Sequence, residues 1–181
     1  MPVEAFREHW RERHAPLIVR LPGIRRYIQN TPLDSDSTYD GIAESSFDDT
    51  QAMKALARTP EYAAVLDDEP RFIDPAGMGS VITEEHVLRE GSPPFTALKS
   101  IAFVKREPGT SIDDFFRAFL DAGSRAAQSS RVVRYVQCHA RRAIYDSGRE
   151  PAYDAFAMAW SKDGAGASDA SALSVSERVV I

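Results

Sequence analysis

The first regular pattern of apolar positions lies close to the start of the chain. Its members recur every third or fourth residue: Phe6, Trp10, His14 and Leu17. Residues at this spacing share one face of a helix, so the pattern predicts an amphipathic helix that ends near Pro16. His14 stands at the end of the inward stripe, where a buried polar ring needs a partner or a function. His9 lies on the flank of that stripe, about 140° of helical arc from His14 at about 100° per residue.

Short apolar runs separated by turn residues follow this helix in the first half of the chain. They predict strands over residues 24–30, 39–47 and 81–88, and helical segments over 51–59 and 61–66. The polar residues Asp48, Asp49 and Thr50 stand directly before the first of these segments and predict its N-cap. The first half therefore mixes helices and strands.

The same order returns after a linker that contains glycine and proline at residues 91–94. It predicts strands over 101–106, 134–138, 153–157 and 177–180, and a helix over 112–120 with Ser111 as its N-cap. Residues 164–171 predict only a weak helix, because they carry glycines and few apolar anchors. Arg26-Tyr27-Ile28-Gln29 aligns with Arg134-Tyr135-Val136-Gln137, so one unit is used twice with a period of about 110 residues.

This succession predicts an α+β fold of two ferredoxin-like βαββαβ repeats, one over residues 1–91 and a degenerate one over 92–181. The first repeat lacks its opening strand, because Met1-Pro2-Val3 already aligns with Thr110-Ser111-Ile112 at the start of the second repeat's helix. Either the chain starts late, or another segment or subunit completes the sheet.

Composition excludes several classes of function. The chain of 181 residues is 43% hydrophobic and 27% charged, which is typical of a globular protein. Its net charge of −5, without a basic run, argues against nucleic acid as a partner. No apolar stretch approaches the roughly 20 residues of a membrane span, and the first residues do not resemble a secretory signal. Cys138 is the only cysteine, which excludes an internal disulfide and a CxxC site. We therefore expect a cytoplasmic protein.

Several motifs in the first half, taken together, resemble the EthD family over residues 3–88. They are His9-Trp10, His14-Ala15-Pro16-Leu17, Pro22-Gly23, Arg26-Tyr27-Ile28-Gln29-Asn30 and Tyr39-Asp40-Gly41-Ile42-Ala43-Glu44. The resemblance implies a dimeric α/β barrel, with helices outside paired sheets and a small-molecule pocket between helix and sheet. It implies no particular cofactor, and we expect none. Related barrels include cofactor-free monooxygenases, muconolactone isomerases, polyketide cyclases and decarboxylases.

The two repeats also separate residues that the fold needs from residues that are free to serve a site. Tyr27 recurs as Tyr135, so a structural role competes with the donation of its hydroxyl to a substrate oxygen. His9 and His14 align with Ala118 and Gly123 and have no counterparts. We therefore interpret His14 as a general base or acid, since imidazole titrates near neutral pH, and His9 as a residue that orients His14 or touches the ligand. A buried structural histidine is the alternative for both.

Four further side chains are candidates for substrate binding. Trp10 and Phe6 would form aromatic walls, although core packing is the simplest explanation for Trp10. His86 and Glu44 occur in the first repeat only. The aligned residues of the second repeat are Arg178 and Met158. A metal site is not expected, because the two histidines are five residues apart rather than the four of HExxH and no third ligand is evident.

These features together predict a cofactor-independent enzyme that transfers a proton on a small hydrophobic, aromatic or polyketide-like substrate and forms a homodimer. Decarboxylation, dehydration, cyclisation and isomerisation all fit such a site, so a lyase or isomerase is the first expectation. A cofactor-free monooxygenase or other oxidoreductase of the same barrel type is an alternative. A ligand-binding accessory protein without catalysis is another.

Overall fold

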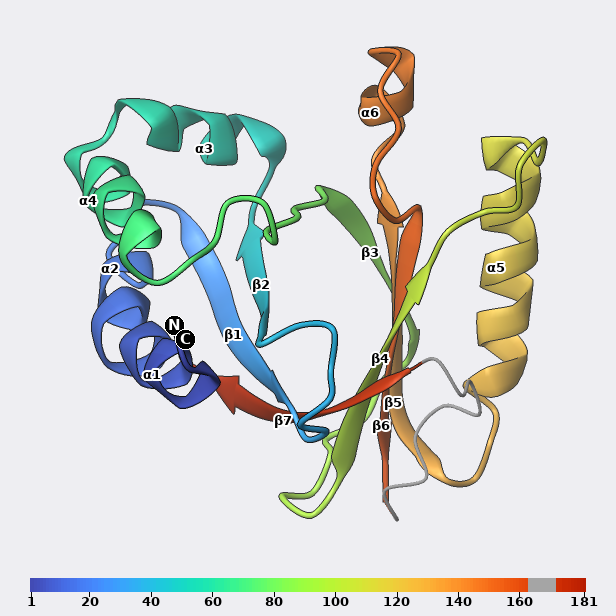
Figure 1. Ribbon diagram of the computed structural model, residues 1–181. Helices are drawn as coiled ribbons and strands as arrows, with labels where there is room; N and C mark the ends of the chain where they lie inside the picture. Colours follow the sequence, from blue (N-terminus) through green and yellow to red (C-terminus); the bar gives the residue numbers. More distant parts are fainter. Residues whose placement is uncertain (163–171) are drawn as a thin grey trace. The chain divides into compact units, whose positions relative to one another are not determined.

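The computed structural model describes residues 1–162 and 172–181, and it is a mixed α+β structure with antiparallel strand pairs (Figure 1). The chain divides into two compact units. Unit 1 comprises Met1–Met78 and Ser176–Ile181, and unit 2 comprises Gly79–Val175. The weak helix expected over residues 164–171 lies outside the described residues. Within the described ranges, no helix combines the length and the apolar character that crossing a bilayer requires.

Unit 1 begins with three helical segments that follow one another without a break. The α-helix α1 (Val3–His9) continues into a π-helical turn, η1 (Trp10–His14), and then into a second α-helix, α2 (Ala15–Ile18). The helical segments end at Ile18, two residues after Pro16, which agrees with the expected end near Pro16. A proline inside a regular helix lacks its N–H and clashes with the carbonyl four residues earlier, but here the wider turn precedes Pro16 and the helix continues beyond it.

The strands β1 (Ile24–Pro32) and β2 (Ile42–Phe47) of unit 1 pair in antiparallel fashion, with Tyr27 opposite Ser45. Four short helical segments follow: α3 (Thr50–Ala55), η2 (Leu56–Arg58), α4 (Pro60–Asp68) and η3 (Glu69–Arg71). The predicted cap of α3 is confirmed, since the Asp49 side chain accepts a hydrogen bond from the Ala52 N–H. Thr59 caps α4 in the same way, by accepting from the Tyr62 N–H.

The core of unit 1 lies between these helices and β1. Its buried members are Ala15, Ile18, Leu21, Tyr27, Leu56 and Val65. The end of the chain also belongs to this unit, because the Val180 N–H donates to the Tyr27 carbonyl and the Tyr27 N–H donates to the Ile181 carbonyl. Tyr27 is therefore held on both sides of its backbone, and its ring is 1% exposed.

Unit 2 contains β3 (Thr83–Arg89), β4 (Leu98–Val104), β5 (Val132–Ala140), β6 (Ala155–Ser161) and the first residues of β7 (Leu173–Val179). These strands lie in the order β7-β4-β6-β5-β3. The helices of the unit are α5 (Ile112–Ala126) and the short α6 (Arg142–Asp146). Ser111 caps α5 as predicted, because its side chain accepts from the Asp114 N–H.

Candidate functional site

The π-helical turn in the first helix changes the relation between the two predicted histidines. Hydrogen bonds in such a turn run between residues five apart, and here the Ala15 N–H donates to the Trp10 carbonyl. Residues five apart then become neighbours on one face, as residues four apart are in an α-helix. The expected separation of about 140° assumed a regular α-helix at about 100° per residue and is wrong, because the helix is not regular there. His9 and His14 face the same partner.

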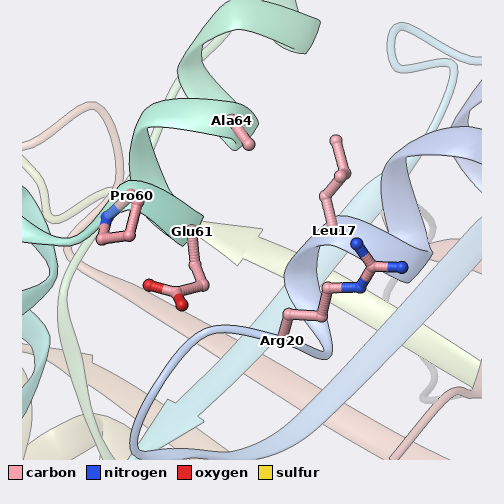
Figure 2. Close-up of a pocket in the computed structure, with 5 residues that line it drawn as sticks. All are labelled: Leu17, Arg20, Pro60, Glu61 and Ala64. Carbon is pink, nitrogen blue, oxygen red and sulfur yellow. The ribbon is translucent and has the colours of Figure 1, made fainter.

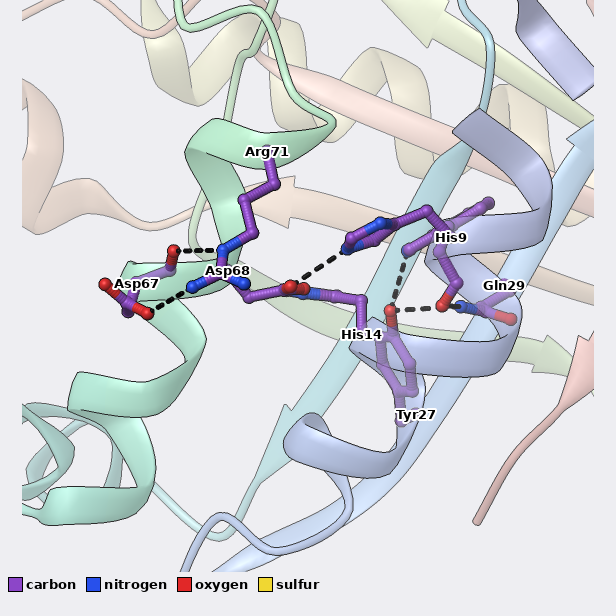
Figure 3. A network of polar contacts seen from close by, with 8 residues as sticks. His9, His14, Tyr27, Gln29, Asp67, Asp68 and Arg71 are labelled. Carbon is purple, nitrogen blue, oxygen red and sulfur yellow. Dashed lines mark hydrogen bonds and ion pairs between the residues drawn. The ribbon is translucent and has the colours of Figure 1, made fainter. Parts of the chain in front are cut away.

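That partner is Asp68, the last residue of α4. The Nε2 atom of His9 lies 2.9 Å from one carboxylate oxygen of Asp68, and Nδ1 of His14 lies 3.0 Å from the other (Figure 3). His14 is 5% exposed and Asp68 is 8% exposed, so the pair is shielded from water. One buried carboxylate therefore holds two imidazole rings.

The charges in this cluster follow from its hydrogen bonds. Burial raises the pKa of Asp68, but the hydrogen bonds from His9 and His14 outweigh it, and the pKa is lowered overall. An ionised carboxylate only accepts hydrogen bonds, so the nitrogen that faces it on each ring carries the hydrogen. Burial lowers the pKa of His14 despite its bond to Asp68, which keeps that ring neutral at pH 7. The neutral ring has its hydrogen on Nδ1 and a lone pair on Nε2.

A second polar network extends from the same helical segment to β1 and β7. The indole Nε1 of Trp10 donates to the Tyr27 hydroxyl at 2.9 Å, and Nε2 of Gln29 donates to the Trp10 carbonyl at 2.9 Å. Arg178 donates from Nη1 to the side-chain oxygen of Gln29, also at 2.9 Å. Burial raises the pKa of Tyr27, so its hydroxyl keeps its proton at neutral pH.

Aromatic rings lie between the two networks. The Phe72 ring stacks on His9 with centroids 4.6 Å apart and contacts His14 at 4.9 Å. Phe6 lies 5.5 Å from Phe72 and 5.6 Å from Trp10. The expectation that Phe6 and Trp10 are wall residues stays a prediction. Phe72 contacts both histidine rings, Phe6 contacts Phe72, and Trp10 contacts Phe6.

An open groove of about 280 Å³ lies between α2 and α4 (Figure 2). Its lining residues are Leu17, Arg20, Pro60, Glu61 and Ala64. None of them belongs to the histidine cluster. Leu17 lies three residues after His14, and Ala64 lies four residues before Asp68, so each stands one helical turn from a member of the cluster.

Two predicted binding residues occur elsewhere. Glu44 accepts a hydrogen bond from Asn30 Nδ2 at 2.7 Å and pairs across the strands with Ile28, which places it on the face of β1 and β2 opposite Tyr27. His86 belongs to unit 2, where its ring lies 4.3 Å from that of His139. Neither is part of the His9–Asp68–His14 cluster.

Sequence reasoning missed Asp68, Phe72 and Arg178 as members of the site. Asp68 stands in an acidic run that reads as a solvated surface. The available signal was its register, because Val65, Asp68 and Phe72 follow one another at helical spacing and all three are buried. No pattern in the sequence indicates Arg178 as a site residue. It lies near Gln29 because the end of the chain pairs with the backbone of Tyr27. Among the described residues, no group of three or more His, Cys, Asp or Glu side chains could hold a metal ion.

No curated protein and no solved structure matches the chain significantly. The family model of the EthD domain matches residues 1–76. This range contains both histidines, Asp68, Phe72 and the strand that carries Tyr27. The first 76 residues of this chain are therefore similar to the EthD domain.

Proposed function

We propose that the chain is a cofactor-independent enzyme that uses His14 to move a proton on a small hydrophobic substrate. The observation that carries the proposal is the bond between His14 Nδ1 and Asp68, which fixes the hydrogen on one nitrogen and leaves Nε2 as a base. A carboxylate that orients an imidazole in this way also stabilises the imidazolium that forms when the ring accepts a proton.

The neighbouring residues support the same reaction. His9 binds the other oxygen of the Asp68 carboxylate and thereby helps to position that carboxylate for its bond to His14. Tyr27 stays protonated and is suited to donate a hydrogen bond to a substrate oxygen. The rings of Phe6, Trp10 and Phe72 suit an aromatic or polyketide-like substrate. Proton transfer of this kind serves decarboxylation, dehydration, cyclisation and isomerisation, so we propose a lyase or an isomerase.

We propose that the substrate approaches along the groove between α2 and α4. Leu17 and Ala64 line this groove, and each stands one helical turn from a member of the cluster. The groove is therefore aligned with the two helices that carry His14 and Asp68. Its lining combines the apolar Leu17, Pro60 and Ala64 with the charged Arg20 and Glu61, so it offers apolar contacts to a hydrophobic molecule.

We also propose that the chain is built from two ferredoxin-like repeats and, as an EthD domain protein, forms a homodimeric barrel. Within unit 2 the strand order β7-β4-β6-β5 is that of a ferredoxin-like sheet. One contact also recurs: Gln29 donates to the Trp10 carbonyl at 2.9 Å, and Gln137 donates to the Phe119 carbonyl at 2.8 Å. Sedimentation equilibrium tests the dimer directly, since a monomer at micromolar concentration contradicts it.

Exchange of a carbon-bound hydrogen tests the function without knowledge of the natural substrate. Benzoylacetone and phenylpyruvate are aromatic carbon acids whose hydrogens next to the carbonyl are replaced in D2O when a base removes them. We expect the protein to accelerate this exchange, as followed by NMR, and the His14→Ala variant to lose the acceleration while it still unfolds cooperatively.

The matched control is His139→Gln, which removes a buried histidine from unit 2 and is expected to exchange at the wild-type rate. Equal rates for the wild-type protein and His14→Ala would overturn the proposal. Benzoylacetone binding without exchange in the wild-type protein would also overturn it, and would favour a ligand-binding accessory protein instead.

A further inference from the structure

The Tyr27 hydroxyl is surrounded by donors. Trp10 Nε1 donates to its oxygen at 2.9 Å, and Gln29 Nε2 approaches the same oxygen at 3.4 Å. An indole N–H and an amide NH₂ have no lone pair to offer in return. Both contacts therefore use the oxygen as an acceptor, and neither engages the hydroxyl hydrogen.

Two further hydrogen bonds hold the Gln29 amide with its NH₂ group, and not its oxygen, toward the Tyr27 hydroxyl. Its oxygen accepts from the Arg178 guanidinium at 2.9 Å, and its nitrogen donates to the Trp10 carbonyl at 2.9 Å. A guanidinium only donates and a backbone carbonyl only accepts, so the two ends of the amide cannot be exchanged. Arg178 thereby prevents the Gln29 oxygen from turning toward Tyr27.

The hydroxyl hydrogen of Tyr27 consequently finds no acceptor among the residues that the structure describes. The side chain is 1% exposed, so bulk water does not reach the hydroxyl to accept its hydrogen bond. A buried donor without an acceptor is rare and calls for an explanation. An acceptor oxygen from a bound molecule supplies one.

Unit 2 shows which part of this arrangement belongs to the fold. The bond from Gln137 to the helix carbonyl of Phe119 recurs there, but phenylalanine has no N–H to match that of Trp10. The Gln137 oxygen contacts His139 Nε2 at 3.1 Å, whereas the Gln29 oxygen contacts an arginine. The bond from glutamine to the helix is thus common to both units, and the donors Trp10 and Arg178 are particular to unit 1.

We infer that Gln29 and Arg178 are positioning residues that hold the Tyr27 hydroxyl as a hydrogen-bond donor to a carbonyl oxygen of the ligand, which is an aryl ketone or a related aryl carbonyl compound. This inference rests on the proposed function. As His14 Nε2 takes the proton from the carbon next to the carbonyl, the C–H electron pair moves into the enolate. The carbonyl oxygen becomes the enolate oxygen and accepts the Tyr27 hydrogen bond more strongly.

A pair of probes separates this role from packing. Benzoylacetone carries carbonyl oxygens, whereas butylbenzene has a similar apolar body and no acceptor. We expect Tyr27→Phe to weaken benzoylacetone binding by about tenfold and to leave butylbenzene binding unchanged, as measured by calorimetry. Arg178→Met is expected to shift the same ratio in the same direction by a smaller factor, because it removes one of the two hydrogen bonds that hold the Gln29 amide in this orientation.

Arg178→Lys restores a donor to the Gln29 oxygen and is expected to recover most of the lost preference for benzoylacetone. The NMR signal of the Trp10 indole N–H reports whether each Arg178 variant keeps the surrounding fold. Equal weakening of both probes in Tyr27→Phe assigns the residue to packing and overturns the inference. This readout is binding alone, so it stands apart from the exchange test, which fails separately if His14 is not a base.

Discussion

His14 and Asp68 are 54 residues apart in the sequence, and their side chains meet at 3.0 Å in a buried hydrogen bond. This bond joins the end of the π-helical turn η1 to the end of α4 and sets the hydrogen on Nδ1 of His14. The same carboxylate binds His9 at 2.9 Å through its other oxygen. The proposed role of His14 as a base therefore depends on Asp68, which holds the ring but is not itself proposed to transfer a proton.

Asp68→Asn tests this dependence with almost no change in volume. An amide presents its NH₂ group as readily as its oxygen, so it can favour the tautomer of His14 that has its hydrogen on Nε2. We expect deuterium exchange into benzoylacetone to fall by roughly 10²-fold or more, since a wrong tautomer removes the base. NMR of the ¹⁵N-labelled histidines checks the tautomer. An unchanged tautomer with an unchanged exchange rate would contradict the assigned role of Asp68.

Gly41 supports the position of Trp10. A Cβ atom added at Gly41 would lie 2.4 Å from the Trp10 ring, so any larger residue displaces the indole. We expect Gly41→Ala to break the Trp10–Tyr27 hydrogen bond and to lower the free energy of unfolding by about 1–3 kcal/mol, measured in urea. Gly79→Ala is the matched control, because nothing lies within 4 Å of a Cβ atom at that position. Equal stability of the two variants would show that the indole has room to move.

The groove between α2 and α4 gives a test of substrate access. Ala64 is exposed on α4 and lines the groove, so Ala64→Trp fills it without disturbing the core. We expect the apparent KM for benzoylacetone to rise at least severalfold, while the melting temperature stays within a few degrees of the wild-type value. Ala63→Trp, on an exposed position that does not line the groove, is the control. A KM unchanged by Ala64→Trp would place the entrance elsewhere.

The sequence predicted most strands, the cap at Ser111 and the inward position of His14, because these follow from apolar spacing and local hydrogen bonding. It could not predict the partner of His14. Asp68 is one of several acidic residues in its run, and only the packing of α4 against the first helix selects it. The π-helical turn could not be predicted for another reason: a periodicity of about 100° per residue describes regular helices only.

Unit 2 provides a prediction for acid stability through His139. Burial, and then the charge of His86, lower the pKa of His139 to about 4. The folded pKa lies below that of the unfolded chain, so the unfolded state binds more protons between about pH 6.5 and pH 4. The free energy of unfolding therefore falls as the pH drops through this window, by at most ~3 kcal/mol from this group. Urea titrations across the window are expected to show a smaller fall for His139→Gln, which does not titrate. An equal fall would assign the acid sensitivity to other groups.

The π-helical turn is what one extra residue in an otherwise regular helix would produce. In unit 1 a glutamine side chain donates to a helix carbonyl 19 residues earlier, and in unit 2 a similar bond spans 18 residues, where α5 has no such turn. Deletion of the exposed Arg13 together with Pro16→Ala, which removes the proline that a regular helix does not tolerate, is therefore expected to yield a regular α-helix that still folds cooperatively. It leaves His9 and His14 four residues apart, which is the spacing at which an α-helix directs two side chains to one partner.

Deletion of the exposed Ser124 from α5 is the control, and it rotates the rest of that helix by about 100° against its sheet. We expect a larger loss of unfolding free energy in urea from the Ser124 deletion. Equal losses would mean that the turn does not accommodate a surplus residue.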